Sequence, residues 1–240
     1  DYEFLYVGSL ASGVGSNDIG LDRGQLGSEK LVKFIKKGNK LLLVEPNLYY
    51  RAESENKSEK KSVEQAFAKS VIFGFEIIES KDQYHLVDFT PFLMFDRHGV
   101  ARTLRDSKQG TYKIDKSKSA VELNNTKAFP ENVEFEALLT FSGEAKGNLI
   151  RSVSPDPNNV TVIQHHSFIK LPDSKYKPRK FDPRSGAISI SYMDYSTPID
   201  ESITKKYIIR HRLEKKNPEL EISEAVEPII YYLDPGTPEP

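Results

Sequence analysis

Apolar and polar residues alternate at a period of two along much of this chain, and this pattern most constrains its fold. It is clearest in residues 132–142, where the apolar side chains from Val133 to Phe141 occupy every second position. In an extended chain these side chains point to one face, which is typical of a strand with one side against a core. The stretch therefore predicts a long strand of an antiparallel sheet, because such sheets commonly keep one face solvated.

Strand-like runs of this kind recur from end to end and are separated by short turns. Two of these turns, Gly38-Asn39 and residues 80–83, predict hairpins. The remaining strands are predicted at residues 4–10, 31–37, 40–45, 47–52, 73–79, 84–88, 115–121, 160–171 and 187–195, with a strand or short helix at 206–212.

Helical signals are few. Ser62 is a candidate cap for a short helix, and Thr90-Pro91 begins a second one over residues 92–96, with Gly99 just past its end. The charged tract 53–61 is predicted to be a solvated loop. The fold class that follows is mainly β with an α+β minority: a sandwich- or barrel-like antiparallel sheet with one or two short helices.

Composition excludes several classes of protein. With 34 basic and 35 acidic residues, the chain has no overall field that would attract nucleic acid, so no nucleic-acid partner is expected. Cysteine is absent, which excludes a disulfide framework and any thiolate metal site. No apolar run reaches about 18 residues, so no membrane span is predicted.

Glycines near the N-terminus invite a phosphate-loop interpretation. Gly13 and Gly15 are not followed by Gly-Lys-Ser or Gly-Lys-Thr, and no helix start follows Gly15, so turns are the favoured explanation. Asp18 and Asp22 could instead hold a cation, although the run lacks the alternating oxygen ligands and terminal glutamate of a calcium loop.

His165-His166 is the only histidine cluster. Neighbouring residues of a strand point to opposite faces, so one of the two is predicted to be buried and hydrogen-bonded and the other exposed. A site assembled from His85, His98 and His211 is an open alternative. The chain contains no His-Glu-x-x-His motif.

No residue is nominated for catalysis, for cofactor binding or for metal binding. A Ser-His-Asp combination would need a serine to nominate, and the chain has no Gly-x-Ser-x-Gly elbow. Pairs of carboxylates do not indicate a catalytic site in a chain with 35 acidic residues. This segment is therefore not expected to be an enzyme by itself.

Two polar features have structural explanations. Arg210 and Arg212 are predicted to pair with a carboxylate such as Asp182 or Asp194, which would fix the loop 178–186. A nucleic-acid contact by the same basic run is disfavoured by the balanced charge.

Paired tyrosines at 49–50 and 231–232 suggest either a sugar-stacking platform or ordinary strands. In a strand, alternation would bury one tyrosine of each pair and expose the other, and this structural interpretation is favoured.

The C-terminal residues 227–240 predict a buried-type strand followed by a turn at Asp234-Pro235-Gly236. Pro238 and Pro240 then resemble the lead-in to a helix. We therefore expect the chain to be part of a longer protein in which a second domain begins here, and its start to be trimmed as well.

Several long motifs resemble, in order, a domain that precedes the catalytic domain of large bacterial zinc-dependent metalloproteases of the metzincin kind. They are residues 15–27 (GSNDIGLDRGQLG), 166–173 (HSFIKLPD), 181–186 (FDPRSG), 207–216 (YIIRHRLEKK) and the junction 228–240 (PIIYYLDPGTPEP). The resemblance covers nearly the whole chain.

The resemblance implies a domain division and a location. Residues 1–226 would be a β-rich non-catalytic domain, and residues 227–240 the linker and first strand of the catalytic domain. That catalytic domain would carry the zinc, bound by a His-Glu-x-x-His-x-x-Gly-x-x-His helix whose glutamate activates a zinc-bound water. Such proteins carry secretion signals, so the implied location is extracytoplasmic. The family's segment is a domain of unknown function, and no binding residue is carried over.

The function expected is that of an accessory domain that packs on, shapes or covers the catalytic domain of a zinc metalloendopeptidase, or assists its folding. An inhibitory, propeptide-like role is a narrower version, in which an aspartate or histidine would have to replace the absent thiolate. The partner is then the chain's own downstream domain, and a peptide substrate is a further candidate. The alternatives are a peptide- or polysaccharide-binding β module and a self-contained enzyme.

Overall fold

A computed structural model describes residues 2–16, 18–233 and 236–238, and it divides the chain into two compact units. The first unit comprises residues 1–47 and 68–172, and the second comprises residues 48–67 and 173–240. The second unit therefore combines an insertion between two strands of the first unit with the C-terminal third of the chain. The predicted boundary between residues 226 and 227 falls inside the second unit and stays a prediction.

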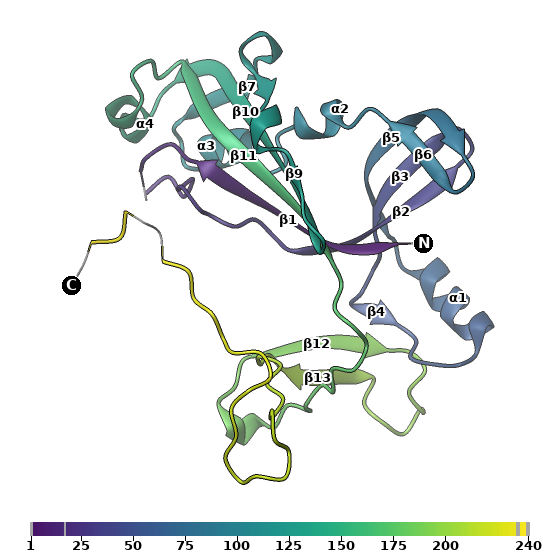
Figure 1. Ribbon diagram of the computed structural model, residues 1–240. Helices are drawn as coiled ribbons and strands as arrows, with labels where there is room; N and C mark the ends of the chain where they lie inside the picture. Colours follow the sequence, from purple (N-terminus) through teal and green to yellow (C-terminus); the bar gives the residue numbers. More distant parts are fainter. Residues whose placement is uncertain (1, 17, 234–235, 239–240) are drawn as a thin grey trace. The chain divides into compact units, whose positions relative to one another are not determined.

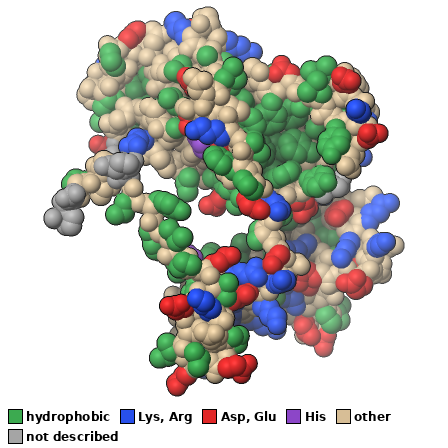
Figure 2. Space-filling view, viewed as in Figure 1, with side chains coloured by type: hydrophobic (Ala, Val, Ile, Leu, Met, Phe, Trp, Pro, Cys, Tyr) green, Lys and Arg blue, Asp and Glu red, His purple; other side chains and the backbone are tan. Residues whose placement is uncertain are grey.

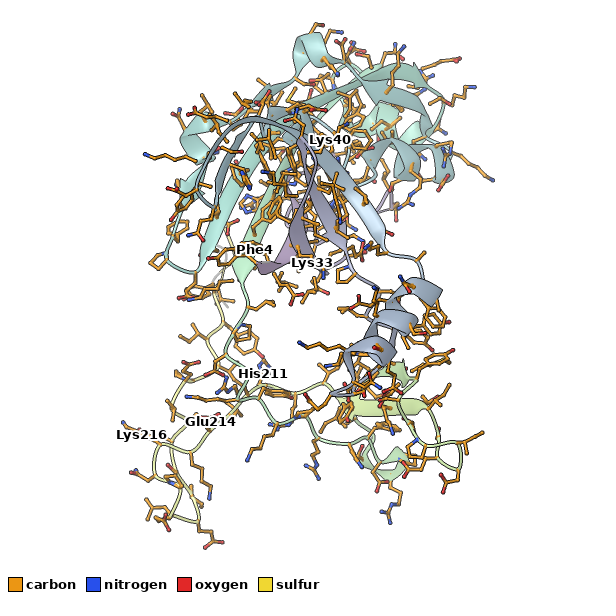
Figure 3. The ribbon with its side chains drawn as sticks, turned by 90° about the vertical axis from the view of Figure 1, so that its right-hand side faces the viewer. Phe4, Lys33, Lys40, His211, Glu214 and Lys216 are labelled. Atoms are coloured by element: carbon orange, nitrogen blue, oxygen red, sulfur yellow. The ribbon has the colours of Figure 1, made fainter. Side chains whose placement is uncertain are left out.

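The first unit is a curled antiparallel sheet, as Figure 1 shows. Its strand order is β6-β5-β3-β2-β1-β11-β10-β7, and β8 and β9 also pair with β10. The strands are β1 (Glu3–Ser12), β2 (Lys30–Lys37), β3 (Lys40–Glu45), β5 (Ser70–Lys81), β6 (Tyr84–Val87), β7 (Gly110–Ile114), β8 (Ala120–Val121), β9 (Lys127–Ala128), β10 (Asn132–Ala145) and β11 (Asn159–Lys170). In Figure 3, Phe4 and Lys33 lie near one another on neighbouring strands, and Lys40 marks the turn between β2 and β3.

Three short helices belong to this unit: α2 (Thr90–Leu93), α3 (Val100–Asp106) and α4 (Asn148–Val153). The Asp96 side chain stabilises the start of α3. Its carboxylate accepts hydrogen bonds from the backbone N–H groups of Gly99, Val100 and Ala101 at 2.8 to 2.9 Å. Gly99 itself adopts a left-handed conformation with φ of 80°. Gly99 therefore caps the N-terminus of α3, whereas it was predicted just past the C-terminus of a helix at 92–96.

The core of the first unit is formed by one face of the sheet together with α2, α3 and α4. Every second residue of β10 contributes to it, with Ala137, Leu139 and Phe141 fully buried, as the alternation predicts. Aromatic rings fill much of the interior; Phe92 on α2, for example, contacts Tyr6 and Phe168 at centroid distances of 5.8 and 6.0 Å. The opposite face of β10 and β11 is mostly polar, although Leu138 and Ile163 are paired on it.

The second unit contains a three-stranded sheet in the order β13-β12-β4, made of β4 (Tyr50–Arg51), β12 (Ser189–Asp194) and β13 (Thr204–Ile208). β4 pairs with β12 in parallel. Helix α1 (Lys57–Ala66) follows β4, and its neighbour Phe67 stacks on Tyr50 with ring centroids 4.0 Å apart. Residues 214–226 form a loop closed by a bridge between Lys215 and Ala225; His211, Glu214 and Lys216 are labelled in Figure 3.

The predicted fold class is confirmed: the chain is mainly β, the sheet is antiparallel and curled, and both hairpins form. The described residues form four short α-helices, whereas one or two were predicted. The additional helices, α3 and α4, have only seven and six residues. Helices of this length carry too few turns to show a helical period in sequence. None of the described helices is long and apolar enough to cross a membrane.

Four local predictions were wrong. Helix α1 begins at Lys57 and is capped by Asn56, whose side chain accepts from two backbone N–H groups, so much of the supposed loop 53–61 is helical. The strand predicted at 115–121 is mostly absent, because β7 ends at Ile114, a 3-10 turn occupies Lys116–Lys118, and only Ala120–Val121 form a strand. Residues 209–212 continue no strand, and residues 229–233 form no strand either. The turn predicted at 234–236 falls partly outside the described residues.

Candidate functional sites

His166 is the buried member of the histidine pair, as predicted, and lies in a polar network inside the first unit. Its Nδ1 is 2.9 Å from the Tyr6 hydroxyl and its Nε2 is 3.2 Å from the Gln164 amide nitrogen. The ring has no exposed surface. Burial, followed by the nearby His165 and Arg97, lowers the pKa of His166 from 6.5 to about 3, so the ring is neutral at pH 7.

Gln164 links this histidine to the segment before α3. Its amide oxygen accepts hydrogen bonds from the backbone N–H groups of Arg97 and His98 at 2.8 Å, and its amide nitrogen donates to the Phe95 carbonyl at 2.9 Å. The Arg97 guanidinium lies over the Phe92 and Phe95 rings at 4.6 and 4.4 Å. These bonds pair several polar groups of the core, although Arg97 Nε and His98 Nδ1 are buried without a partner among the described residues. Because His166 is fully buried, we interpret the network as structural.

His165 points to the opposite face of the sheet and lies between two glutamates of β10. Its Nε2 is 2.8 Å from Glu134 Oε2, and its Nδ1 is 3.1 Å from Glu136 Oε1. Ser167 donates to the same Glu134 oxygen and lies 3.3 Å from His165 Nε2. The imidazole of His165 is about a quarter exposed, so the prediction that the second histidine of the pair is exposed is only partly met. Its contacts with the two carboxylates were not predicted.

This polar cluster has the residue types of a catalytic triad but not the geometry. The Glu134 carboxylate accepts hydrogen bonds from both Ser167 and His165, so the serine hydroxyl donates to an acid rather than to the imidazole. A metal ion is not accommodated either, because the two glutamates face opposite ring nitrogens. Among the described residues, no group of three histidine, aspartate or glutamate side chains could hold a metal ion.

The other histidines and the glycine-rich segment form no common site in the described part of the chain. His85 bonds to Ser80 in a hairpin, and His98 contributes to the segment before α3. Gly15 and Gly20 have φ values of 86° and 77°, which agrees with the turn explanation. Asp18 is exposed.

Arg210 and Arg212 pair differently from the prediction. Arg212 forms ion pairs with Asp173 at 2.6 Å and Glu214 at 3.0 Å, and Arg210 donates to the carbonyl of Lys177 at 2.8 Å. The predicted partners are engaged locally: Asp182 binds Arg184, and Asp194 accepts from Glu53 and Ser196. The two arginines therefore anchor residues 173–177, just before the loop that they were expected to fix.

The second unit contains a pocket of about 510 Å³ that the sequence analysis did not find. It is lined by Arg51 and Glu53 beside β4, by Tyr176 and Pro178 in the following loop, by Ile190 and Tyr192 of β12, and by the run from Tyr207 to Arg210. Strand alternation places Ile190, Tyr192 and Tyr207 on one face of the small sheet, because Ile190 is paired with Tyr207.

Both arginines of this pocket are stacked on tyrosine rings. The Arg51 guanidinium lies 3.6 Å from the Tyr192 ring centroid, and the Arg210 guanidinium lies 5.0 Å from that of Tyr176. The Tyr192 hydroxyl donates to Glu53 Oε1 at 2.7 Å. Burial and this hydrogen bond raise the pKa of Tyr192, so the hydroxyl remains a donor at neutral pH.

The segment from Ile229 to Leu233 is exposed in the structure. Tyr231 and Tyr232 are 81% and 90% exposed, so the prediction that one of them is buried is wrong. Ile229, Ile230 and Leu233 are exposed as well, and Figure 2 shows hydrophobic side chains along this C-terminal segment. Tyr50, by contrast, is half-buried against Phe67, and its neighbour Tyr49 is more exposed, as alternation predicts for that pair.

Comparison with known protein families identifies the family of this chain. A family model described as a domain of unknown function, DUF5117, matches residues 24–216, which include most of the sheet of the first unit and the small sheet of the second. No curated protein and no solved structure matches the chain.

Proposed function

The chain belongs to the DUF5117 family, and from this premise we propose that it is a non-catalytic accessory domain of a secreted, zinc-dependent metallopeptidase. Its role would be to pack on the catalytic domain of the same protein and shape or cover the cleft. The single observation that carries the proposal is the exposed apolar segment from Ile229 to Leu233, where the sequence motifs resemble the junction with such a catalytic domain.

The surface of that segment favours docking. Five consecutive large apolar side chains are exposed there, and burying one such side chain contributes about 1.5–3 kcal/mol. Isoleucine and tyrosine favour strands, and a strand needs a neighbour to satisfy its backbone groups. The proposal is that the catalytic domain provides this neighbour and that the segment becomes a strand of its sheet.

In this proposal the chemistry belongs to the catalytic domain. That domain would hold zinc and activate the water that attacks the peptide carbonyl, and the present chain would contribute surface rather than reacting groups. The protein would act outside the cytoplasm, as the resemblance implies.

The docking role is tested with a protein in which the chain is joined to the proposed catalytic domain. Ile230→Asp places a charge within the apolar segment, and we expect it to lower the thermal stability of the joined protein and its peptidase activity. Ile199→Asp is the matched control, because Ile199 is fully exposed elsewhere in the second unit. Equal behaviour of the two variants would contradict docking through this segment.

Activity of the isolated chain is a separate test. We expect purified chain to hydrolyse no casein and to bind no stoichiometric zinc. Casein hydrolysis that disappears with a chelator would overturn the accessory role.

A second candidate function, a peptide-binding module, is favoured by a different observation. The pocket of the second unit combines two arginines with exposed aliphatic side chains, which is the mixture that a peptide ligand requires.

A further inference from the structure

We infer that the pocket between β4, β12, β13 and the loop at Tyr176 binds a peptide segment that carries a carboxylate. This inference deepens the second candidate function and does not depend on a metallopeptidase domain. It rests on the positive charge of the pocket, on its aliphatic lining and on the way in which its aromatic rings are covered.

The first element of the site is Arg51. Its guanidinium is held flat against Tyr192, and this stacking fixes the plane in which its N–H groups can donate. The closest carboxylate oxygen, Glu53 Oε1, is 3.9 Å from Nη1, too long for a hydrogen bond. The Arg51 Nε is also buried without an acceptor among the described residues. The guanidinium is therefore positioned but not saturated with acceptors.

The second element is Arg210, which is fixed by contacts of its own. It lies over Tyr176 and donates to the carbonyls of Lys177 and His211 at 2.8 and 3.4 Å. Both acceptors are neutral, so these bonds orient the guanidinium without cancelling its charge.

The charges of the pocket do not balance. Two arginines face one glutamate, and that glutamate already accepts a hydrogen bond from Tyr192. Figure 2 shows further lysine and arginine side chains, interspersed with acidic ones, on the surface of this part of the chain. One excess positive charge remains in the lining, and a carboxylate is its complement, because an arginine can bind both oxygens of a carboxylate.

The remaining lining favours a peptide over a sugar. Ile190 and Ile209 are 61% and 62% exposed at the pocket and offer aliphatic surface. A sugar would need an open aromatic face, but Tyr192 has Arg51 over its ring and Tyr207 stacked beside it at an interplanar angle of 11°. Tyr176 is covered by Arg210. An acidic residue flanked by aliphatic side chains matches this arrangement.

The test is binding of short fluorescent peptides to the complete chain, measured by anisotropy. The first probe is Gly-Ile-Glu-Ile-Gly with both ends blocked, and its control replaces the glutamate by glutamine. A third probe, Gly-Gly-Ile-Gly-Ile with a free C-terminal carboxylate, distinguishes a side-chain carboxylate from a terminal one. We expect at least one acidic probe to bind at least about tenfold more tightly than the glutamine peptide. The glutamine peptide cannot form the charge-assisted hydrogen bond between a carboxylate and an arginine.

Variants locate the binding site. Arg51→Gln and Arg210→Gln should each weaken the binding of the acidic probe about tenfold, while leaving the weak binding of the glutamine peptide unchanged. Arg184→Gln is the matched control, because Arg184 lies in the same unit, pairs with Asp182 and is 89% exposed. Circular dichroism shows whether each variant is folded. If Arg51→Gln unfolds, Arg210→Gln and the salt dependence of wild-type binding still decide the outcome.

Three results would overturn the inference. They are an affinity for both acidic probes no higher than that for the glutamine peptide, no binding of either acidic probe to the wild type, and an effect of Arg184→Gln as large as that of the pocket variants. None of these results bears on the proposed docking of the segment from Ile229 to Leu233, which is tested by Ile230→Asp in the joined protein. The docking proposal and the pocket proposal can therefore fail separately.

Discussion

Tyr6 and His166 meet in the interior of the first unit through a hydrogen bond of 2.9 Å between two buried side chains. Tyr6→Phe removes the hydroxyl and leaves the Nδ1 of His166 without its partner. We expect a loss of about 1–3 kcal/mol in the free energy of unfolding, because a buried polar atom left unpaired keeps its desolvation cost.

Urea denaturation of the two proteins measures this loss. Tyr2→Phe is the control, since Tyr2 is largely exposed and its hydroxyl can bond to water. If both variants lose the same stability, the buried bond contributes nothing of its own.

The same histidine makes stability depend on pH. Its pKa is about 3 in the folded protein and 6.5 without the fold, because burial disfavours the charged ring. Between these values the unfolded chain binds the extra proton, so the stabilisation is complete above about pH 6.5 and is lost as the pH falls toward 3. The expected slope for one proton is about 1.4 kcal/mol per pH unit.

Comparison with His166→Gln isolates this effect, since the carboxylates titrate in both proteins. Between pH 7 and 5 the wild type should lose stability relative to His166→Gln, whereas His85→Gln, in an exposed hairpin, should follow the wild type. Parallel pH profiles of the wild type and His166→Gln would show that the histidine does not carry the dependence.

Residues of the candidate sites were only partly predictable. The two faces occupied by His165 and His166 follow from strand alternation alone. The glutamates beside His165 come from another strand, and their position depends on the register in which Glu136 is paired with His165. Register is set by the packing of the whole sheet and is not visible in a single strand. The partners of Arg212 were missed for a different reason: many carboxylates in the sequence could have paired with it.

At the scale of elements, the pairing of β7 with β10 depends on a residue without a side chain. A Cβ added to Gly143 would lie 2.1 Å from the Thr111 carbonyl oxygen in the neighbouring strand. Gly143→Ala should therefore separate these strands locally and cost about 1–3 kcal/mol of stability.

Thermal denaturation and amide hydrogen exchange of residues 110–114 measure this effect. Gly8→Ala is the control, because its Cβ would meet the nearest atom at 3.4 Å, an ordinary contact. Unchanged protection of β7 in Gly143→Ala would contradict the close approach.

Strands and helices were predictable where apolar residues repeat at a regular spacing, and not where the element depends on a single contact. The long strands β10 and β11 appear in the sequence within three residues of their observed ends. Helix α1 was placed too late because its cap, Asn56, lies in a charged tract with little apolar periodicity. The strand expected at 229–233 has a suitable composition, but strand formation also requires a neighbouring strand.

For the whole molecule, the division into two units places both proposals in the second unit. The first unit holds a buried polar network and a large core, and the second holds the arginine pocket and the exposed segment after Val226. The curled sheet was predictable as a class, whereas the pocket was not, because its residues come from four separate stretches of sequence.

The central claim is that this chain serves a zinc peptidase domain, and it is tested most directly by determining the coding sequence that follows Pro240. The account predicts a His-Glu-x-x-His motif on a helix within about two hundred codons, since two histidines one helical turn apart are needed to bind zinc. A stop codon at that point, or a continuation without the motif, would contradict the claim and leave the peptide-binding module as the function to pursue.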